Sequence, residues 1–507
     1  MRKILRLYYT KKETTMKKFT TILLLCAMLL SLAACGNEVG ESTDTESTAD
    51  TAAADNTETE SETELIRENT PDDLPEMNFG GKTLTILAEE STHGYLQVEE
   101  LTGDITDDAI YSRNSKVSER FQAELHIVDG GNYEAVSKTV NDAIVAGETT
   151  YDLVVSHTIQ QGINVANGSY LPWNNVPYVD FTKPWWNASM ATDLSYKGYS
   201  YLAMGDFDVT AIMYSCALFY NKDLGNKLGL PNMYDVVREG QWTKDKFAEL
   251  IANAYSDLNG DGTRDAEDQY GFALNSKEDI NSFLWCFGKK LYEKNEDGTF
   301  SNVYYDEKLV NMVEWLYNFK YNEDFTYTDD GWTTGYDMLT KGNTLFSCNC
   351  IDQALWMRES EIDYAILPMP KWDDAQESYI TPIAGGVSSE GVMMNTENLE
   401  MVGVLTEALN AESWRTVTPA IVDSALKHKG ARDEDSAEMI ELILATRTAD
   451  FGVVYGGWDS PRSALKRVID SNRSTDITSY YEKNKKTWEA TMDSVFASFE
   501  ELVEKNK

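Results

Sequence analysis

Short apolar segments alternate with segments of helical pattern through the first half of the chain, and this order restricts the fold more than any other feature. The apolar segments are rich in aliphatic and β-branched residues, as buried strands are. They are Thr83–Ala88 (TLTILA), Leu125–Val128 (LHIV) and Tyr151–Ser156 (YDLVVS). Helical pattern covers about 109–123 and 133–146. Strands that alternate with helices form a parallel sheet covered on both faces, so the sequence predicts an α/β fold.

The length of 507 residues exceeds what one compact core usually holds, and it suffices for two lobes and a tail. The second half has a different character, with one tight-turn signal, Asn295–Gly298, and mostly helical pattern. Thr243 is placed to cap a helix over 243–256. Further helices are predicted at 307–321, 397–411, 419–427, 434–446, 463–469 and 480–504.

The N-terminus has the pattern of a secretion signal. Lys17 and Lys18 precede the apolar run Ile22–Leu30, and small residues follow it. Leu32-Ala33-Ala34-Cys35 resembles the bacterial lipobox, in which the cysteine is lipidated and becomes the mature N-terminus. We therefore expect a lipoprotein signal peptide over 1–35, with Met16 as a plausible true start. The alternative is an uncleaved anchor. A lipid on Cys35 would hold the protein to the extracellular face of the cell membrane.

Residues 36–73 are predicted to form a disordered acidic tether. Glu38–Glu64 contains Ser, Thr, Ala, Asp and Glu but no Lys, Arg or aromatic residue, so it has little apolar surface to bury. The whole chain has a formal net charge of −40. Such a surface repels phosphate backbones, so the composition argues against a nucleic-acid partner.

One acidic segment matches a calcium loop of the EF-hand type. Oxygen-bearing side chains occupy loop positions 1, 3, 5, 9 and 12, glycine occupies position 6, and position 7 would offer its carbonyl. The predicted ligands are Asp257, Asn259, Asp261, Thr263, Asp265 and Asp268. Position 12 carries Asp where Glu is usual, and the shorter side chain reaches less far. We expect a structural Ca2+ here; the alternative is an acidic turn without metal.

Several segments together resemble the family 1 extracellular solute-binding proteins, the carbohydrate-importer group. Leu218–Leu224 (LFYNKDL), with the preceding Leu194–Gly198, looks like the family's segment that crosses between lobes. Gly229-Leu230-Pro231 followed by Trp242-Thr243 resembles its helix entry. Asp363–Pro370 resembles the returning hinge strand, and Gly456-Gly457-Trp458 also fits. The similarity covers about residues 80–500.

The resemblance implies a two-lobed periplasmic-binding-protein-like (type II) fold, with a ligand cleft between the lobes and a multi-strand hinge. It places the N-terminal lobe at 74–209 and 366–412, and the C-terminal lobe at 210–365 and 413–507. Asp352 lies at a position similar to one where the family binds its ligand, and Asp206, which precedes the crossing segment, is a further candidate ligand residue facing the cleft. Trp458 resembles the family's position for stacking on a sugar ring.

Two further candidates follow from the strand positions alone. Ligands in open α/β sheets bind at the carboxyl ends of the strands. Glu89 follows the first predicted strand and His157 follows the third. Carboxylates accept strong hydrogen bonds from hydroxyl groups, which suits sugar recognition. The pair Trp185-Trp186 is predicted to pack in the core.

The expected function is capture of a sugar or oligosaccharide for an ABC importer, whose permease subunits would be separate chains. We expect a monomer without catalytic activity. No nucleophile motif occurs, and the four histidines lack metal-ligand spacing. Two alternatives stay open. A cell-surface glycoside hydrolase needs only two carboxylates across a cleft, and an acid-rich cleft would also suit a non-sugar solute such as a peptide or polyamine.

Overall fold

The computed structural model describes residues 62–506, except 275–278, 322–323, 330, 332, 358–359, 384–385, 427–433 and 459. The chain divides into two compact units, Met1–Asn69 and Thr70–Lys507. The predicted signal peptide and Cys35 lie outside the described residues. Helix α2 (Glu62–Asn69) falls inside the segment predicted to be disordered, and its Glu, Leu and Arg residues are good helix formers.

The second unit contains two mixed five-stranded sheets. The first sheet has the order β2 (Glu124–Asp129), β1 (Thr83–Ala88), β3 (Leu153–His157), β13 (Ser388–Met393), β4 (Tyr170–Leu171). The second sheet has the order β11 (Tyr364–Leu367), β5 (Cys216–Asn221), β10 (Thr344–Cys350), β6 (Tyr270–Leu274), β9 (Thr326–Thr328). The predicted α/β class is therefore confirmed, and the arrangement is consistent with two α/β lobes.

Each sheet departs from the expected all-parallel order at one strand. β1 is parallel to both β2 and β3, but β13, which is distant in sequence, pairs antiparallel with β3 and β4. In the second sheet β10, β6 and β9 are parallel, and β5 pairs antiparallel with β10 and β11. Each antiparallel strand pairs with strands that lie far from it in the sequence.

The described part of the chain also contains two small two-stranded sheets. β12 (Thr381–Pro382) pairs with β14 (Arg447–Thr448) in parallel. The predicted turn at Asn295–Gly298 joins β7 (Tyr292–Lys294) to β8 (Phe300–Asn302) in an antiparallel hairpin.

Helices surround the sheets, and most of the predicted helices begin close to their predicted residues. They are α3 (Glu90–Leu96), α4 (Ile105–Phe121), α5 (Tyr133–Ala146), α6 (Thr158–Ala166), α7 (Ala188–Asp193), α8 (Thr210–Met213), α9 (Lys222–Leu228), α10 (Met233–Arg238), α11 (Lys244–Ile251), α12 (Asp279–Cys286), α13 (Glu307–Tyr321), α14 (Thr334–Thr340), α15 (Asp352–Trp356), α16 (Leu399–Glu412), α17 (Thr418–Leu426), α18 (Glu434–Ala445), α19 (Phe451–Tyr455), α20 (Ala464–Lys466) and α21 (Ile477–Asn506).

Local capping explains several helix starts. Thr243 accepts a hydrogen bond from the Lys246 amide at 3.3 Å and begins α11, as predicted. Asn132 caps α5 in the same way through the Ala135 amide. A side-chain oxygen at this position satisfies an amide that the helix itself leaves unpaired.

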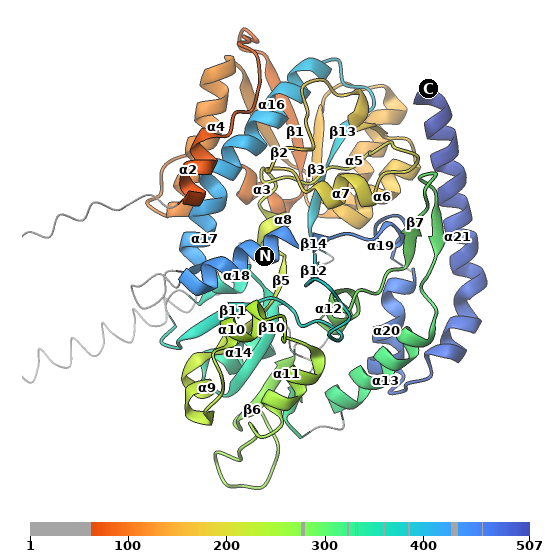
Figure 1. Cartoon of the computed structure of the whole chain (residues 1–507). Helices are drawn as coiled ribbons and strands as arrows, with labels where there is room; N and C mark the ends of the chain where they lie inside the picture. The colour runs from red at the N-terminus through yellow and green to blue at the C-terminus, as the bar shows by residue number, and fades with distance from the viewer. Residues whose placement is uncertain are drawn as a thin grey trace, which may run out of the picture. The chain divides into compact units, whose positions relative to one another are not determined.

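The C-terminal helix α21 links distant parts of the second unit. It contacts α13 and α20 near one end and α6 near the other (Figure 1). Phe499 on α21 packs against Tyr196, Tyr201 and Tyr455, with ring centroids 4.8–5.7 Å apart. The largest hydrophobic cluster accordingly contains residues from both five-stranded sheets and from α21.

Candidate functional site

The carboxyl ends of β1 and β3 bring two predicted ligand residues together. The strands are parallel neighbours, with Ala88 opposite Val155, so Glu89 and His157 lie at the same edge of the sheet. The Glu89 Oε2 atom accepts hydrogen bonds from the His157 amide at 2.9 Å and from Ser156 Oγ at 3.2 Å. The strand register therefore fixes the position of Glu89.

The environment of Glu89 favours its neutral form. Its side chain is buried, and burial raises its pKa above the usual range. Hydrogen bonds from Ser91, the His157 amide and Ser156 oppose this shift because they stabilise the carboxylate. Most of the acceptor capacity of Glu89 is therefore directed to the protein itself.

His157 belongs to a compact group of rings, here named the aromatic cluster and made of Tyr133, His157 and Trp458. The ring of His157 lies 5.2 Å from that of Tyr133 and 5.0 Å from that of Trp458. The rings of Tyr133 and Trp458 are 5.5 Å apart. Tyr133 is the first residue of α5, His157 is the last of β3, and Trp458 follows α19. Three separate segments thus supply the cluster.

Two polar side chains orient Trp458. Its indole Nε1 donates a hydrogen bond to Gln160 Oε1 at 3.3 Å. The Arg462 guanidinium lies 4.9 Å from the ring centroid, a cation–π distance. The side chain still remains 36% exposed. Trp458 therefore presents apolar surface to solvent while its orientation is held by the protein.

The imidazole of His157 is neutral at physiological pH and has hydrogen-bonding capacity to spare. Burial, reinforced by the nearby positive charge of Arg462, lowers the pKa of His157 to about 4. Its Nδ1 atom has no hydrogen-bond partner within the described part of the chain, although the residue is only 7% exposed. A buried polar atom without a partner is uncommon and often marks a place where a ligand or water binds.

The remaining two predicted ligand residues are not part of this cluster. Asp206 is buried and accepts a hydrogen bond from Thr418 Oγ1 at 2.7 Å. Asp352 is also buried at the start of α15, and burial raises its pKa to about 7. The structure thus brings together Glu89, His157 and Trp458, and it places Asp206 against α17.

Tyr214 is close to acids that follow strands of both sheets. Burial raises the pKa of its phenol, and the nearby Tyr95, Asp352, Cys350 and Glu89 raise it further. Glu89 follows a strand of the first sheet, and Asp352 follows a strand of the second. The pKa of Tyr214 is therefore influenced by acids that follow both sheets.

Sequence reasoning missed four residues of this region: Tyr133, Gln160, Arg462 and Tyr214. Tyr133 could have been found, because it follows β2 and the ends of parallel neighbours meet at one edge of the sheet. Gln160 and Arg462 depend on how α6 packs against α19, which no local pattern encodes. Trp185 and Trp186 are buried in the core, so their predicted packing role is confirmed.

The predicted calcium loop has the turns of such a loop but is held by its own hydrogen bonds. Asp257 accepts bonds from the amides of Gly260 and Gly262 at 2.7 and 3.0 Å, and both glycines have φ near +73°. Asp268 is buried and accepts bonds from Tyr255 Oη and the Leu258 amide. Among the described residues, no three His, Cys, Asp or Glu side chains are grouped closely enough to hold a metal.

Calcium binding at this loop stays a prediction with a direct test. We expect excess calcium to raise the melting temperature relative to EDTA, because an ion that binds only the native state stabilises it by about 2.7 kcal/mol at 100 times its Kd. Asp261→Ala should abolish the difference, whereas the control Asp245→Ala, an exposed acid in α11, should keep it. Equal melting temperatures with calcium and EDTA in the unmodified protein would refute the prediction.

Comparisons with known proteins give no relative for this chain: no protein-family model matches it, and no curated protein sequence matches it. In the described part of the chain, no helix is both long enough and apolar enough to cross a membrane.

Proposed function

We propose that this protein is an extracytoplasmic, lipid-anchored solute-binding protein that captures a sugar or oligosaccharide for an ABC importer. The two five-stranded sheets would belong to two lobes that close over the ligand around a multi-strand hinge. The lipid anchor on Cys35 and the permease partner follow from the sequence resemblance. Binding, without chemical conversion, would be the protein's whole task.

The observation that carries this proposal is the aromatic cluster at the carboxyl edge of the first sheet. A partly exposed indole offers an apolar face to a pyranose ring, whose C–H groups form an apolar surface of similar size. The Nδ1 atom of the neutral His157 has no partner in the described part of the chain, and it can donate to or accept from a sugar hydroxyl according to the tautomer. Aromatic surface and a directed polar atom within a few ångströms are what small-molecule sites commonly combine.

Thermal unfolding against a panel of mono- and oligosaccharides tests the proposal, using the chain without residues 1–35. We expect one glycan class to raise the melting temperature. Trp458→Ala should weaken binding roughly ten- to hundredfold, which corresponds to about 1.4–2.8 kcal/mol. Tyr178→Ala, which truncates an aromatic residue that is 42% exposed elsewhere, should leave the affinity unchanged.

The other outcomes separate the alternatives. Release of the aglycone from a chromogenic glycoside would overturn the binding-only function in favour of a glycoside hydrolase. A response to peptides or polyamines, with none to any glycan, would keep a solute-binding protein and reject the sugar.

A further inference from the structure

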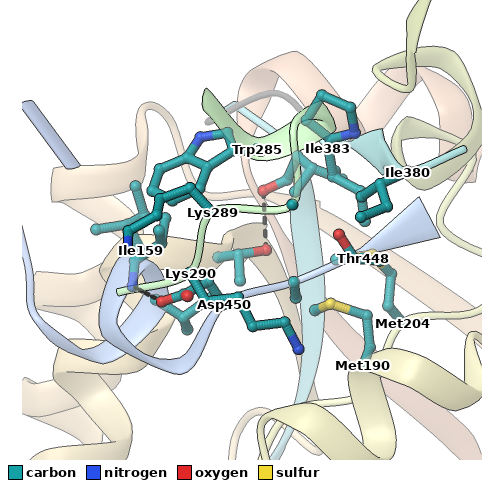
Figure 2. A pocket seen from close by; sticks show the side chains of 17 residues that line it. Ile159, Met190, Met204, Trp285, Lys289, Lys290, Ile380, Ile383, Thr448 and Asp450 are labelled. Carbon is teal, nitrogen blue, oxygen red and sulfur yellow. Dashed lines mark hydrogen bonds between the residues drawn. The ribbon is translucent and has the colours of Figure 1, made fainter. Parts of the chain in front are cut away.

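A second site lies next to the aromatic cluster, at the start of α6. It is a partly open pocket that encloses about 100 Å³ (Figure 2). Thr158 and Ile159, the first two residues of α6, form part of its wall, so it begins one residue after His157. Trp285 lies at its edge in Figure 2, and Met190 and Met204 lie on the opposite side.

The wall of this pocket is mainly aliphatic. Besides the two methionines and Ile159, its apolar lining comes from segments that are distant in sequence: Ile380, Pro382, Ile383, Val387, Ala449, Val453 and Val454. These residues belong to or flank β12, β13, β14 and α19. Water inside such a wall finds few hydrogen-bond partners, so the pocket favours an apolar occupant.

Apart from Lys290 and Thr448, the polar side chains of the lining are engaged by the protein. Thr158 Oγ1 donates to the Val387 carbonyl at 2.9 Å. Lys289 forms an ion pair of 2.6 Å with Asp306. Asp450 accepts two backbone amide hydrogen bonds, at 2.7 and 3.0 Å. A sugar placed here would find few polar partners to replace the water lost from its hydroxyl groups, which is costly.

We propose that this pocket binds a small apolar group, of the size of one aromatic ring or a short branched aliphatic chain. An engineered cavity of roughly 150 Å³ with a similar aliphatic lining, in another protein, stays dry and binds benzene. The pocket here is somewhat smaller but partly open, so a ring can enter while its substituents point outward. The methionine side chains are flexible and can adjust to the shape of the occupant.

This inference does not depend on the solute being a sugar. If the aromatic cluster does bind a sugar, an apolar substituent on that sugar could reach the pocket, because Thr158 and Ile159 of the pocket wall directly follow His157 of the cluster. If the aromatic cluster binds nothing, the apolar pocket remains a ligand site in its own right.

Benzene is the probe, and the methyl groups of methionine report its binding. The chain without residues 1–35 is labelled with 13C at the methionine methyls, and Met190→Leu and Met204→Leu identify two of the signals. We expect ring-current shifts that saturate with benzene and are confined to Met190 and Met204. D-glucose, the polar counter-probe, should leave both signals in place.

Two matched variants locate the effect. Ala449→Phe fills the pocket from its own wall and should reduce the benzene shifts at least tenfold. Ala252→Phe adds the same ring at an exposed position after α11 and should retain them.

Absence of saturable shifts in the unmodified protein, or equal shifts at many methionines, would overturn the proposal even if Ala449→Phe fails to fold. A glycan that stabilises the protein while benzene has no effect would support the proposed function and reject this pocket. Benzene binding without any glycan response would support this pocket and count against the proposed capture of a sugar.

Discussion

Glu407→Ala is expected to destabilise the protein by about 2–6 kcal/mol. The Glu407 carboxylate, buried in α16, accepts hydrogen bonds from the indole Nε1 atoms of Trp185 and Trp186 at 2.9 and 2.8 Å. Removal of the carboxylate leaves two buried donors without acceptors, and each unsatisfied group costs about 1–3 kcal/mol. Urea unfolding followed by circular dichroism measures the difference.

The matched variants separate the lost acceptors from a general effect on α16. Glu407→Gln keeps one oxygen but turns an amide donor toward the second indole, so a loss of about 1–3 kcal/mol is expected. Glu400→Ala removes an exposed acid of the same helix and should change stability by less than about 0.5 kcal/mol. If Glu407→Ala behaves like Glu400→Ala, the two indoles do not depend on Glu407.

The stability of the protein is expected to fall between about pH 4 and pH 7 through a buried acid in its core. Asp208 is fully buried, and its Oδ1 accepts bonds from the Thr210 amide and hydroxyl at 3.1 and 2.7 Å. Burial raises its pKa to about 7; Glu89 adds to the shift, and the Thr210 bonds oppose it. Glu390, also fully buried and close to Asp208, has its pKa raised by burial as well.

The sign of the pH dependence of stability follows from the direction of the pKa shift of Asp208. A carboxyl whose pKa is higher in the folded state contributes stability below its unfolded pKa, and this stability is lost as the pH rises through the folded value. Each unit of pKa difference corresponds to about 1.4 kcal/mol. Asp208→Asn should therefore be more stable than the unmodified protein at pH 8 by on the order of 2–4 kcal/mol, and nearly equal to it at pH 4.

Melting temperatures of the two proteins from pH 4 to pH 8 measure this effect. His157 acts in the opposite direction: its pKa is lowered to about 4, so its contribution is present above about pH 6.5 and is lost on acidification. The comparison with Asp208→Asn cancels that contribution. Asp142→Asn, an exposed acid on α5, is the control and should follow the unmodified protein. Parallel curves for Asp208→Asn would show that Asp208 does not titrate in this range.

Part of the candidate site was predictable because strand order determines where residues meet. The segments 83–88 and 151–156 have the composition of buried strands, and parallel neighbours carry their following residues to one edge. The amino-acid sequence is therefore sufficient to pair Glu89 with His157. The same rule would have included Tyr133, which follows the next strand and its capping residue Asn132.

The contribution of Trp458 to this site required the tertiary structure. Trp458 is separated from His157 by about 300 residues, and it reaches the sheet edge because α19 packs on α6. The Cβ of any residue larger than glycine at position 162 would lie 2.4 Å from the Val454 carbonyl oxygen. Close approach of these two helices thus depends on one glycine, whose importance is visible only once its partner is known.

Local patterns in the sequence determined the elements: the α/β class, the strands and their following helices, the cap at Thr243 and the turn at 295–298. Those features depend on side-chain periodicity and on hydrogen bonds between residues a few positions apart. Only the tertiary structure decided which strands join each sheet in antiparallel order, which acids are buried, and which remote segments enclose the aliphatic pocket. These depend on packing between residues far apart in the chain, and the energy of that packing leaves no periodic trace in the sequence.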